Sequence, residues 1–520
     1  MTHARRIISV VAMLVGAVIT GSAQLQPSNP DSALVTILAQ LQGTPLSLKQ
    51  AIQYSMASAP TLRSAEAALD AARGIVRRES GAFDPSFSVM WDYADQKIPS
   101  ASFFDGAPVL RTLQATGQAG LRWDLPTGTS IGASLNAVRL NTNSSFAFLI
   151  PQYTTFGEIS IRQPLLRGFT LSARKALTGA EQDMDAARAR YDQETLALST
   201  QVEHLYWDLY AGERDYAVQK LTRDRAAAFL KDTELRAQTG LIGPNQVANA
   251  RTFLAEQEIL LLDREEQLDG LSDQIVAAIG ARPDGGQPRF KAVDQPSDDF
   301  VIEETDALVQ KAIERNLELR AAKAFIESRR TMARAASWEA LPQVDFVGSI
   351  GGNGLAGTAH EVIFGADTLR TTVGGAFGDA LRQAVVRDFP TWHVGLEVNI
   401  PIGFRNGLGE QDRLDAELVI AEQRYTQELR ILEAEVRVSC RELEHGKRRL
   451  NAAREGVMAA QEQVRIGLIE FQNGRSTAFE LVRLGADFAV AQQRYSQALV
   501  RSAKAAASLK QLTSGAYSAR

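Results

Sequence analysis

The chain has 520 residues, enough for two or more domains, and its formal net charge is −5. Its basic residues are dispersed among acidic ones, so it is a poor candidate for nucleic-acid binding and we expect no nucleic-acid partner. Because there is one cysteine, Cys440, no intrachain disulfide can form.

The start of the chain has the features of a secretory signal. Arg5 and Arg6 precede an apolar run that ends at Ile19, and small residues follow up to Ala23. The run is shorter than the roughly 20 residues of a membrane-spanning helix. No later apolar stretch is long enough to span a membrane without charges. We therefore expect residues 1–23 to be cleaved and the mature protein to be periplasmic, secreted or an outer-membrane barrel.

The next segment combines one helical pattern with several strand patterns. Apolar and alanine spacing predicts a helix over 46–80, with Ser47 as its N-cap and a break or kink at Pro60. Alternation of apolar and polar residues predicts strands over 87–93 and 113–139. A last alternating run ends at Pro164.

A very long helix follows the strands. Residues 173–239 are rich in Ala, Glu, Gln and Arg and contain no proline. Gly240 and the pair Gly243-Pro244 end this helix, and 245–280 is predicted to return as a second helix. At 1.5 Å per residue the long helix spans roughly 100 Å, which suits a coiled-coil-like bundle.

The second half of the chain has the same plan. Leu62 matches Leu319 and Pro85 matches Pro342 at one offset, and Gly240 matches Gly474 at another. The expected elements are a helix over 306–340, strands between Pro342 and Pro401, a long helix over 407–473 and a return helix over 476–512. The predicted units are signal 1–23, N-terminal extension 24–45, first repeat 46–280, linker 281–305, second repeat 306–513 and tail 514–520.

The predicted fold is mainly α with a minority of β structure. Alternating strands in an exported protein suggest a membrane sheet, which must close because unpaired backbone groups are costly in hydrocarbon. The chain supplies about four to eight strands, too few to close a barrel comfortably. We therefore expect several protomers to share one barrel, with the long helices attached to it.

Several short motifs occur in an order typical of one family. They are Leu46-Ser47-Leu48, Gln163-Pro164-Leu165-Leu166-Arg167-Gly168, Trp392 to Ile402, Gly240-Leu241-Ile242, and Phe471 to Arg475 with Phe479-Glu480. On these motifs the chain resembles the TolC family of outer-membrane efflux proteins over nearly its whole length. The resemblance implies a long-helix α-barrel, continuous with an outer-membrane β-barrel of twelve strands that a homotrimer builds.

The resemblance also implies a function and a location. It implies a passive exit duct in the cell outer membrane that extends into the periplasm, contacts outer-membrane lipid and has no enzyme activity or cofactor. It further implies a periplasmic adaptor (membrane fusion) protein and an inner-membrane pump of the RND, ABC or MFS type. The outlet of a type I protein secretion system uses the same fold and stays open as an alternative. A structural periplasmic coiled-coil tether would explain the helices but not the paired strands.

Members of this family close the periplasmic tip with the two hairpin turns. By that resemblance Glu480 corresponds to an acidic residue of the second hairpin, and Arg475 to an arginine that ties the hairpins together. This chain has Gln246 where the first hairpin often has Asp, and Arg483 where a second acidic ring can occur. The turns expected to contact the adaptor contain Gly240, Gly243 and Gly474.

Two motifs resemble sites of chemistry without their structural context. Gly352-x-Gly354-x-x-Gly357 matches a dinucleotide-binding pattern, but no helix pattern opens directly after it, so we expect a glycine-rich loop at the barrel mouth. Gly128-x-Ser130-x-Gly132 matches an esterase elbow but lies at a turn into a strand. The five histidines have no metal-ligand spacing, and no metal or catalytic residue is predicted.

Overall fold

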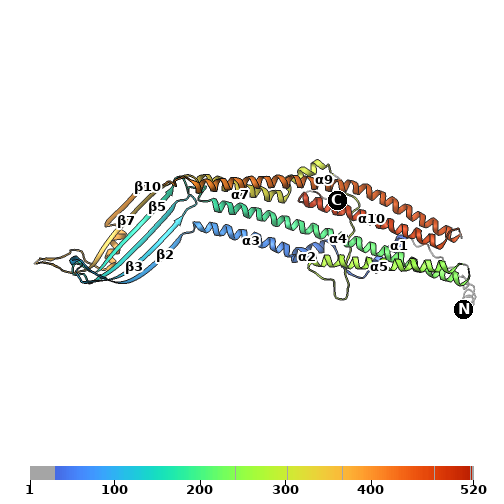
Figure 1. The fold of residues 1–520 in the computed structure, drawn as a ribbon, viewed down its shortest axis with the longest axis horizontal. Helices are drawn as coiled ribbons and strands as arrows, with labels where there is room; N and C mark the ends of the chain where they lie inside the picture. The colour runs from blue at the N-terminus through green and yellow to red at the C-terminus, as the bar shows by residue number, and fades with distance from the viewer. Residues whose placement is uncertain are drawn as a thin grey trace, which may run out of the picture.

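The computed structural model describes residues 30–240, 242–300, 303–365, 367–473, 475–515 and 517. The predicted signal peptide, Gly474 and most of the C-terminal tail therefore lie outside the described residues. The molecule is elongated, with a sheet at one end and a bundle of long helices at the other (Figure 1). The prediction of a mainly α fold with an attached sheet is confirmed.

The first short helices begin at residues that the sequence marks. Helix α2 (Leu48–Ser58) follows Ser47, whose side chain accepts a hydrogen bond from the N–H of Gln50. Helix α3 (Pro60–Ser80) starts with Pro60, which lacks an N–H and is tolerated in a first turn. The predicted break therefore separates two helices.

The expected single helix over 306–340 is also two helices. Helix α6 (Thr305–Arg315) ends before Asn316, and helix α7 (Leu317–Glu339) begins after it. The Asn316 side chain accepts a hydrogen bond from Leu319 N at 3.0 Å, and its amide donates to Leu512 O at 3.1 Å. The single-helix prediction was wrong because this cap favours a new helix start at Asn316.

The long helices form the body of the bundle. Helix α4 (Lys175–Gln238) packs against α3 and α7 toward the sheet and against α5 (Pro244–Ile279) and α10 (Ala478–Leu512) toward the far end. Helix α9 (Arg405–Gln472) likewise packs against α7, α6 and α10. Short helices therefore lie end to end beside a long one, as their lengths predicted.

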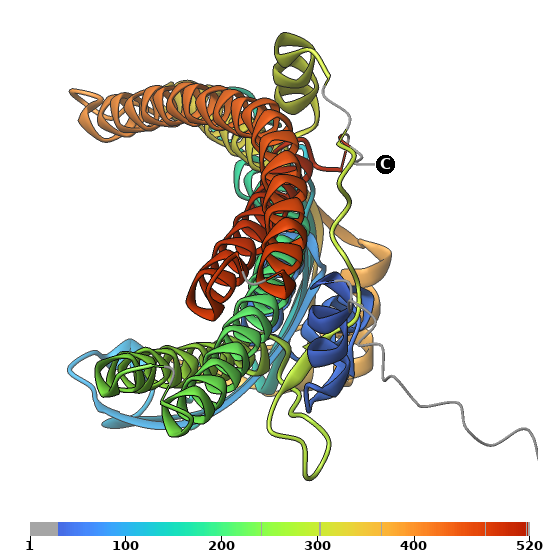
Figure 2. The ribbon, with the colours of Figure 1, turned by 90° about the vertical axis from the view of Figure 1, so that its right-hand side faces the viewer.

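The largest buried cluster lies midway along the long helices. Tyr206 of α4 is fully buried, and its hydroxyl donates to Leu46 O at 3.0 Å and accepts from Asp294 N at 2.9 Å. Leu46 ends β1 (Thr44–Leu46), which pairs in parallel with β6 (Phe290–Ala292). Helix α1 (Pro30–Gln40), α6 and residues 281–300 lie on the convex side of the arc that the chain forms in end view (Figure 2).

The main sheet has six antiparallel strands in the order β10-β7-β5-β4-β3-β2. Their bounds are β2 Ser86–Pro99, β3 Val109–Asp124, β4 Ser130–Thr142, β5 Leu149–Pro164, β7 Gln343–Ala359 and β10 Phe389–Asn399. A twelve-stranded barrel from three copies would need four strands from each chain, whereas the described sheet of this chain has six. The additional pair is the β3–β4 hairpin, which lies in the longer of the two strand regions.

The two faces of the sheet differ in polarity. Paired residues of antiparallel strands point to the same face, so the register assigns each side chain to one face. The apolar face includes Phe87, Trp91, Leu121, Leu135, Ile159, Ile350, Trp392 and Leu396. The polar face includes Asp92, Gln118, Ser134, Asn136, Glu158, Ser349, Thr391 and Glu397.

One helix that the sequence did not predict covers part of the apolar face. Helix α8 (Phe377–Val386) packs on β5 and β7, and Thr155 donates to Ala380 O at 2.6 Å. A Cβ on Gly354 would lie 1.9 Å from Ala380 O, so glycine is needed for this close approach. Gly352, Gly354 and Gly357 therefore belong to strand β7, and the predicted glycine-rich loop was wrong. Helix α8 lies on the convex side of the arc (Figure 2), which makes the apolar face the outer one.

No helix of the described residues is long and apolar enough to span a membrane. The strands β8 (Val362–Phe364) and β9 (Asp367–Leu369) form a separate hairpin between β7 and α8.

Candidate functional site

The first hairpin turn lies at the end of the bundle that is remote from the sheet (Figure 1). Helix α4 ends at Gln238, and Gly240 follows with φ of 76°, a left-handed conformation that favours glycine. Gly243 precedes Pro244, the first residue of α5. These residues give a sharp reversal because glycine stops one helix and proline starts the next.

The second hairpin turn lies at the same end. Helix α9 ends at Gln472, and Thr477 caps α10 by accepting a hydrogen bond from Glu480 N at 3.2 Å. Asn473 donates from its side chain to Ile469 O at 2.8 Å and satisfies one carbonyl of the last turn. The sequence predicted both turns, although Gly474 itself is outside the described residues.

The four predicted gate residues lie at these turns and are exposed in the single chain: Gln246, Arg475, Glu480 and Arg483. Glu480 accepts a hydrogen bond from Ser476 Oγ at 3.2 Å. Within the described part of the chain, no ion pair joins Arg475 or Arg483 to an acidic residue. In the single chain Glu480 therefore bonds within its own turn. Among the described contacts, none joins Arg475 to Gln246.

One contact between the two helical hairpins, joining α4 to α10, was not predicted from the sequence. Arg225 of α4 donates from Nη1 to the backbone oxygen of Gly485 on α10 at 3.0 Å. A Cβ on Gly485 would lie 2.7 Å from that nitrogen, so the glycine makes room for the guanidinium. Arg225 is partly buried at this contact, and this burial lowers the pKa of its guanidinium. We call the pair Arg225 and Gly485 the latch.

Aromatic side chains reinforce the latch toward the tip. Phe229 lies one turn beyond Arg225, and its ring centroid is 6.0 Å from that of Phe479 on α10. The guanidinium of Arg236 lies 5.7 Å from the ring centroid of Phe471 on α9. Such contacts are worth about 0.5–1.5 kcal/mol each. No local sequence signal identifies these pairs, because only helix packing shows which face of α4 meets α10.

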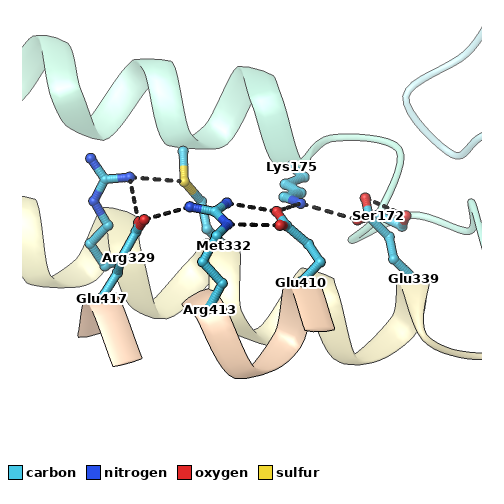
Figure 3. Close-up of polar contacts among 8 residues, drawn as sticks. All are labelled: Ser172, Lys175, Arg329, Met332, Glu339, Glu410, Arg413 and Glu417. Atoms are coloured by element: carbon cyan, nitrogen blue, oxygen red, sulfur yellow. Dashed lines mark hydrogen bonds and ion pairs between the residues drawn. The ribbon is translucent and has the colours of Figure 1, made fainter. Parts of the chain in front are cut away.

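An ionic network, which we call the collar, joins three helices where the bundle meets the sheet (Figure 3). Lys175 Nζ of α4 lies 3.1 Å from Glu339 of α7 and 3.7 Å from Glu410 of α9. Arg413 binds Glu410 at 2.7 Å and lowers the pKa of that carboxyl. Because Lys175 bridges both other helices, the collar fixes this end of the bundle.

The collar continues along α9 and α7. Arg413 also pairs with Glu417, and Arg329 of α7 lies 3.6 Å from the same carboxylate (Figure 3). Most of these groups are partly exposed, so each pair alone contributes about 0–1 kcal/mol. The network therefore links α4, α7 and α9 through several individually weak contacts at the end of the bundle next to the sheet.

The comparisons with known proteins agree with this architecture. Residues 308–515 match the family model described as outer membrane efflux protein. No curated protein sequence matches the chain significantly.

Solved outer-membrane channels share the fold across most of the chain. The outer membrane protein VceC of Vibrio cholerae is 15% identical with a TM-score of 0.61, covering 91% of this chain and 97% of its own. The CmeC channel of Campylobacter jejuni is 11% identical with a TM-score of 0.63, covering 90% and 86%. The open state of the MtrE channel of Neisseria gonorrhoeae is 14% identical with a TM-score of 0.59, covering 90% and 89%. Together with the family match over residues 308–515, this shared fold confirms the resemblance that the motifs indicated.

Proposed function

We propose that this chain, whose residues 308–515 belong to the outer membrane efflux protein family, is one protomer of a passive outer-membrane exit duct. The observation that carries the proposal is the sheet, which has an apolar outer face, a polar inner face and two unpaired edge strands, β2 and β10. A sheet of this kind is stable in lipid only when its edges are paired. The long helices extend this conduit into the periplasm.

A homotrimer is the assembly that we propose. One chain forms only an arc of the wall (Figure 2), and its edge strands β2 and β10 have unpaired backbone groups in the described sheet. Identical copies can pair β2 of one with β10 of the next around an axis. The proposed partners are a periplasmic adaptor and an inner-membrane pump, which supply the energy that a duct without its own chemistry lacks.

The first test is the mass and conductance of the purified protein. In mild detergent we expect a stable particle with three times the protomer mass, because the edge strands need partners. Reconstituted in planar bilayers, it should conduct ions. A monodisperse monomer that does not conduct would contradict the proposal and would favour a periplasmic tether instead.

The proposed gate residues give a second prediction. In a trimer each tip residue occurs three times around the axis, so Glu480 would present three carboxylates to the pore. Glu480→Gln should weaken cation preference and block by trivalent cations. Arg475→Ala should raise single-channel conductance, because Arg475 is proposed to bond neutral acceptors such as Gln246 of a neighbouring turn. Both effects should be absent in Arg465→Ala, since Arg465 pairs with Glu462 on its own helix.

Normal trimers with unchanged conductance and selectivity in both variants would place the gate at other residues. Measurement in salt gradients separates the two effects, because the reversal potential reports selectivity and the slope reports conductance.

A further inference from the structure

The β3–β4 hairpin has no counterpart in the second strand region. In the first region β2 follows Pro85 and β5 ends at Pro164, while in the second β7 follows Pro342 and β10 ends before Pro401. Four strands lie in the first region, against two strands of the main sheet in the second. The hairpin is therefore an addition to a plan that otherwise supplies four strands.

The hairpin is an integral part of the sheet. Strand β3 pairs with β2 from Val109 to Arg122, and β4 pairs with β5 from Ser130 to Leu140. Strands of 16 and 13 residues exceed the roughly 9–11 residues that cross a bilayer.

The polarity of the hairpin matches that of its neighbours. Leu121 and Ala133 point to the outer face with Phe87 of β2, whereas Gln118 and Ser134 point to the inner face. A hairpin that lay in the lumen or in the periplasm would be surrounded by water. It would not need an apolar face continuous with the outer face of the sheet.

The turn of the hairpin contacts residues 163–170, the segment that leads into the long helix α4. Gly128 has φ of 87°, and a Cβ there would lie 2.1 Å from Gly168 O. Thr170 N donates to Thr127 O at 3.1 Å, and Thr129 Oγ1 donates to Gln163 Oε1 at 2.5 Å. The strands β2 and β5 are each joined to a helix of the bundle, whereas this turn joins two strands. The contact with residues 163–170 is what attaches the turn to the segment before α4.

We propose that three copies close an eighteen-stranded barrel, an inference that rests on the proposed trimer. The interface would join β2 of each copy to β10 of the next, and the β3–β4 hairpin would form part of the lipid-facing wall. Barrel diameter grows roughly linearly with strand number, so this barrel is about half as wide again as one of twelve strands. Barrels of about 16–18 strands enclose an aqueous channel, so the narrow point of the duct lies in the helical part and not in the membrane.

The test compares matched cysteine pairs on β3 and β2. In a Cys440→Ser background we would introduce Leu121→Cys or Gln118→Cys on β3, and Val89→Cys or Met90→Cys on β2. All four side chains are exposed in the single chain. Shielding of Leu121 in the trimer therefore indicates lipid, whereas Val89 on the edge strand β2 can also be shielded by β10 of the next copy. Trimers in lipid nanodiscs are treated with a charged, membrane-impermeant maleimide, and the labelling rates are compared.

We expect Gln118→Cys and Met90→Cys to react at least about tenfold faster than Leu121→Cys and Val89→Cys, because lipid excludes the charged reagent. A cross-section of the same particles by electron cryomicroscopy should show eighteen strands. Equal reaction of both β3 cysteines in trimers whose β2 pair still alternates, with twelve strands in cross-section, would overturn the inference and leave the proposed duct intact. Failure to form trimers would instead overturn the proposed function.

Discussion

Replacing Arg225 by alanine is expected to increase the conductance of the isolated channel severalfold, because it removes the latch between α4 and α10. The guanidinium bonds Gly485 O at 3.0 Å in a partly buried place, and a hydrogen bond from a charged group is worth about 1.5–3 kcal/mol. If the bond is lost when the hairpins separate, its removal shifts the equilibrium toward the open state by about tenfold or more. Single-channel recording in planar bilayers without partner proteins measures the open fraction directly.

The control for this experiment is Arg223→Ala. Arg223 lies on the same helix but pairs with Asp224 at 3.1 Å, so its loss leaves the contact with α10 intact. An increase in both variants would indicate general loosening of α4 instead of a latch. Unchanged conductance in Arg225→Ala, with a normal trimer mass, would mean that the two hairpins do not separate at Arg225 when the channel opens.

Replacing Glu213 by glutamine is expected to stabilise the protein at alkaline pH and to leave it unchanged near pH 4.5. Glu213 of α4 is 3% exposed, and burial raises the pKa of its carboxyl to about 8 although nearby cationic side chains oppose the shift. Its Oε1 accepts a hydrogen bond from Ala292 N at 2.7 Å, a bond that the glutamine carbonyl can keep. The substitution therefore removes an ionisable group without removing the acceptor.

The sign of the pH effect follows from proton binding. Between the ordinary pKa of 4.5 and about 8, the folded protein holds a proton at Glu213 that the unfolded chain has released. Stability of the natural chain therefore falls as pH rises through this range, and Glu213→Gln should remove the fall. The expected difference above pH 8 is of the order of a few kcal/mol, since one pKa unit corresponds to about 1.4 kcal/mol.

Thermal unfolding of trimers in detergent, measured from about pH 4.5 to pH 9, is the appropriate experiment. The exposed Glu256→Gln on α5 is the matched control and should follow the natural chain at every pH. Parallel pH profiles for Glu213→Gln and the natural chain would contradict the assignment. They would mean that the carboxylate at this buried position is solvated or paired well enough to stay charged.

The helices and their ends were predictable from the sequence because the signals are local. Ser47 and Pro60 set helix starts through their own backbone chemistry, and Gly240 stops α4 by adopting a positive φ. The Asn316 break was missed although an asparagine cap is also a local signal. Alternation of polarity likewise predicted strands and one apolar face without any knowledge of their partners.

The strand count, α8 and the latch were decided by tertiary structure. The sheet has six strands because β3 and β4 pair with β2 and β5. The alternation of apolar and polar residues in β3 and β4 does not by itself determine this pairing. Glycine is needed at Gly354 because α8 packs closely against β7 there. No residue near Gly354 in the sequence indicates this close approach. Arg225 meets Gly485 across 260 residues, and this contact depends on how two helices are rotated against each other. The contacts proposed for Arg475 and Glu480 at the gate would need further copies of the chain, since only symmetry brings identical turns together.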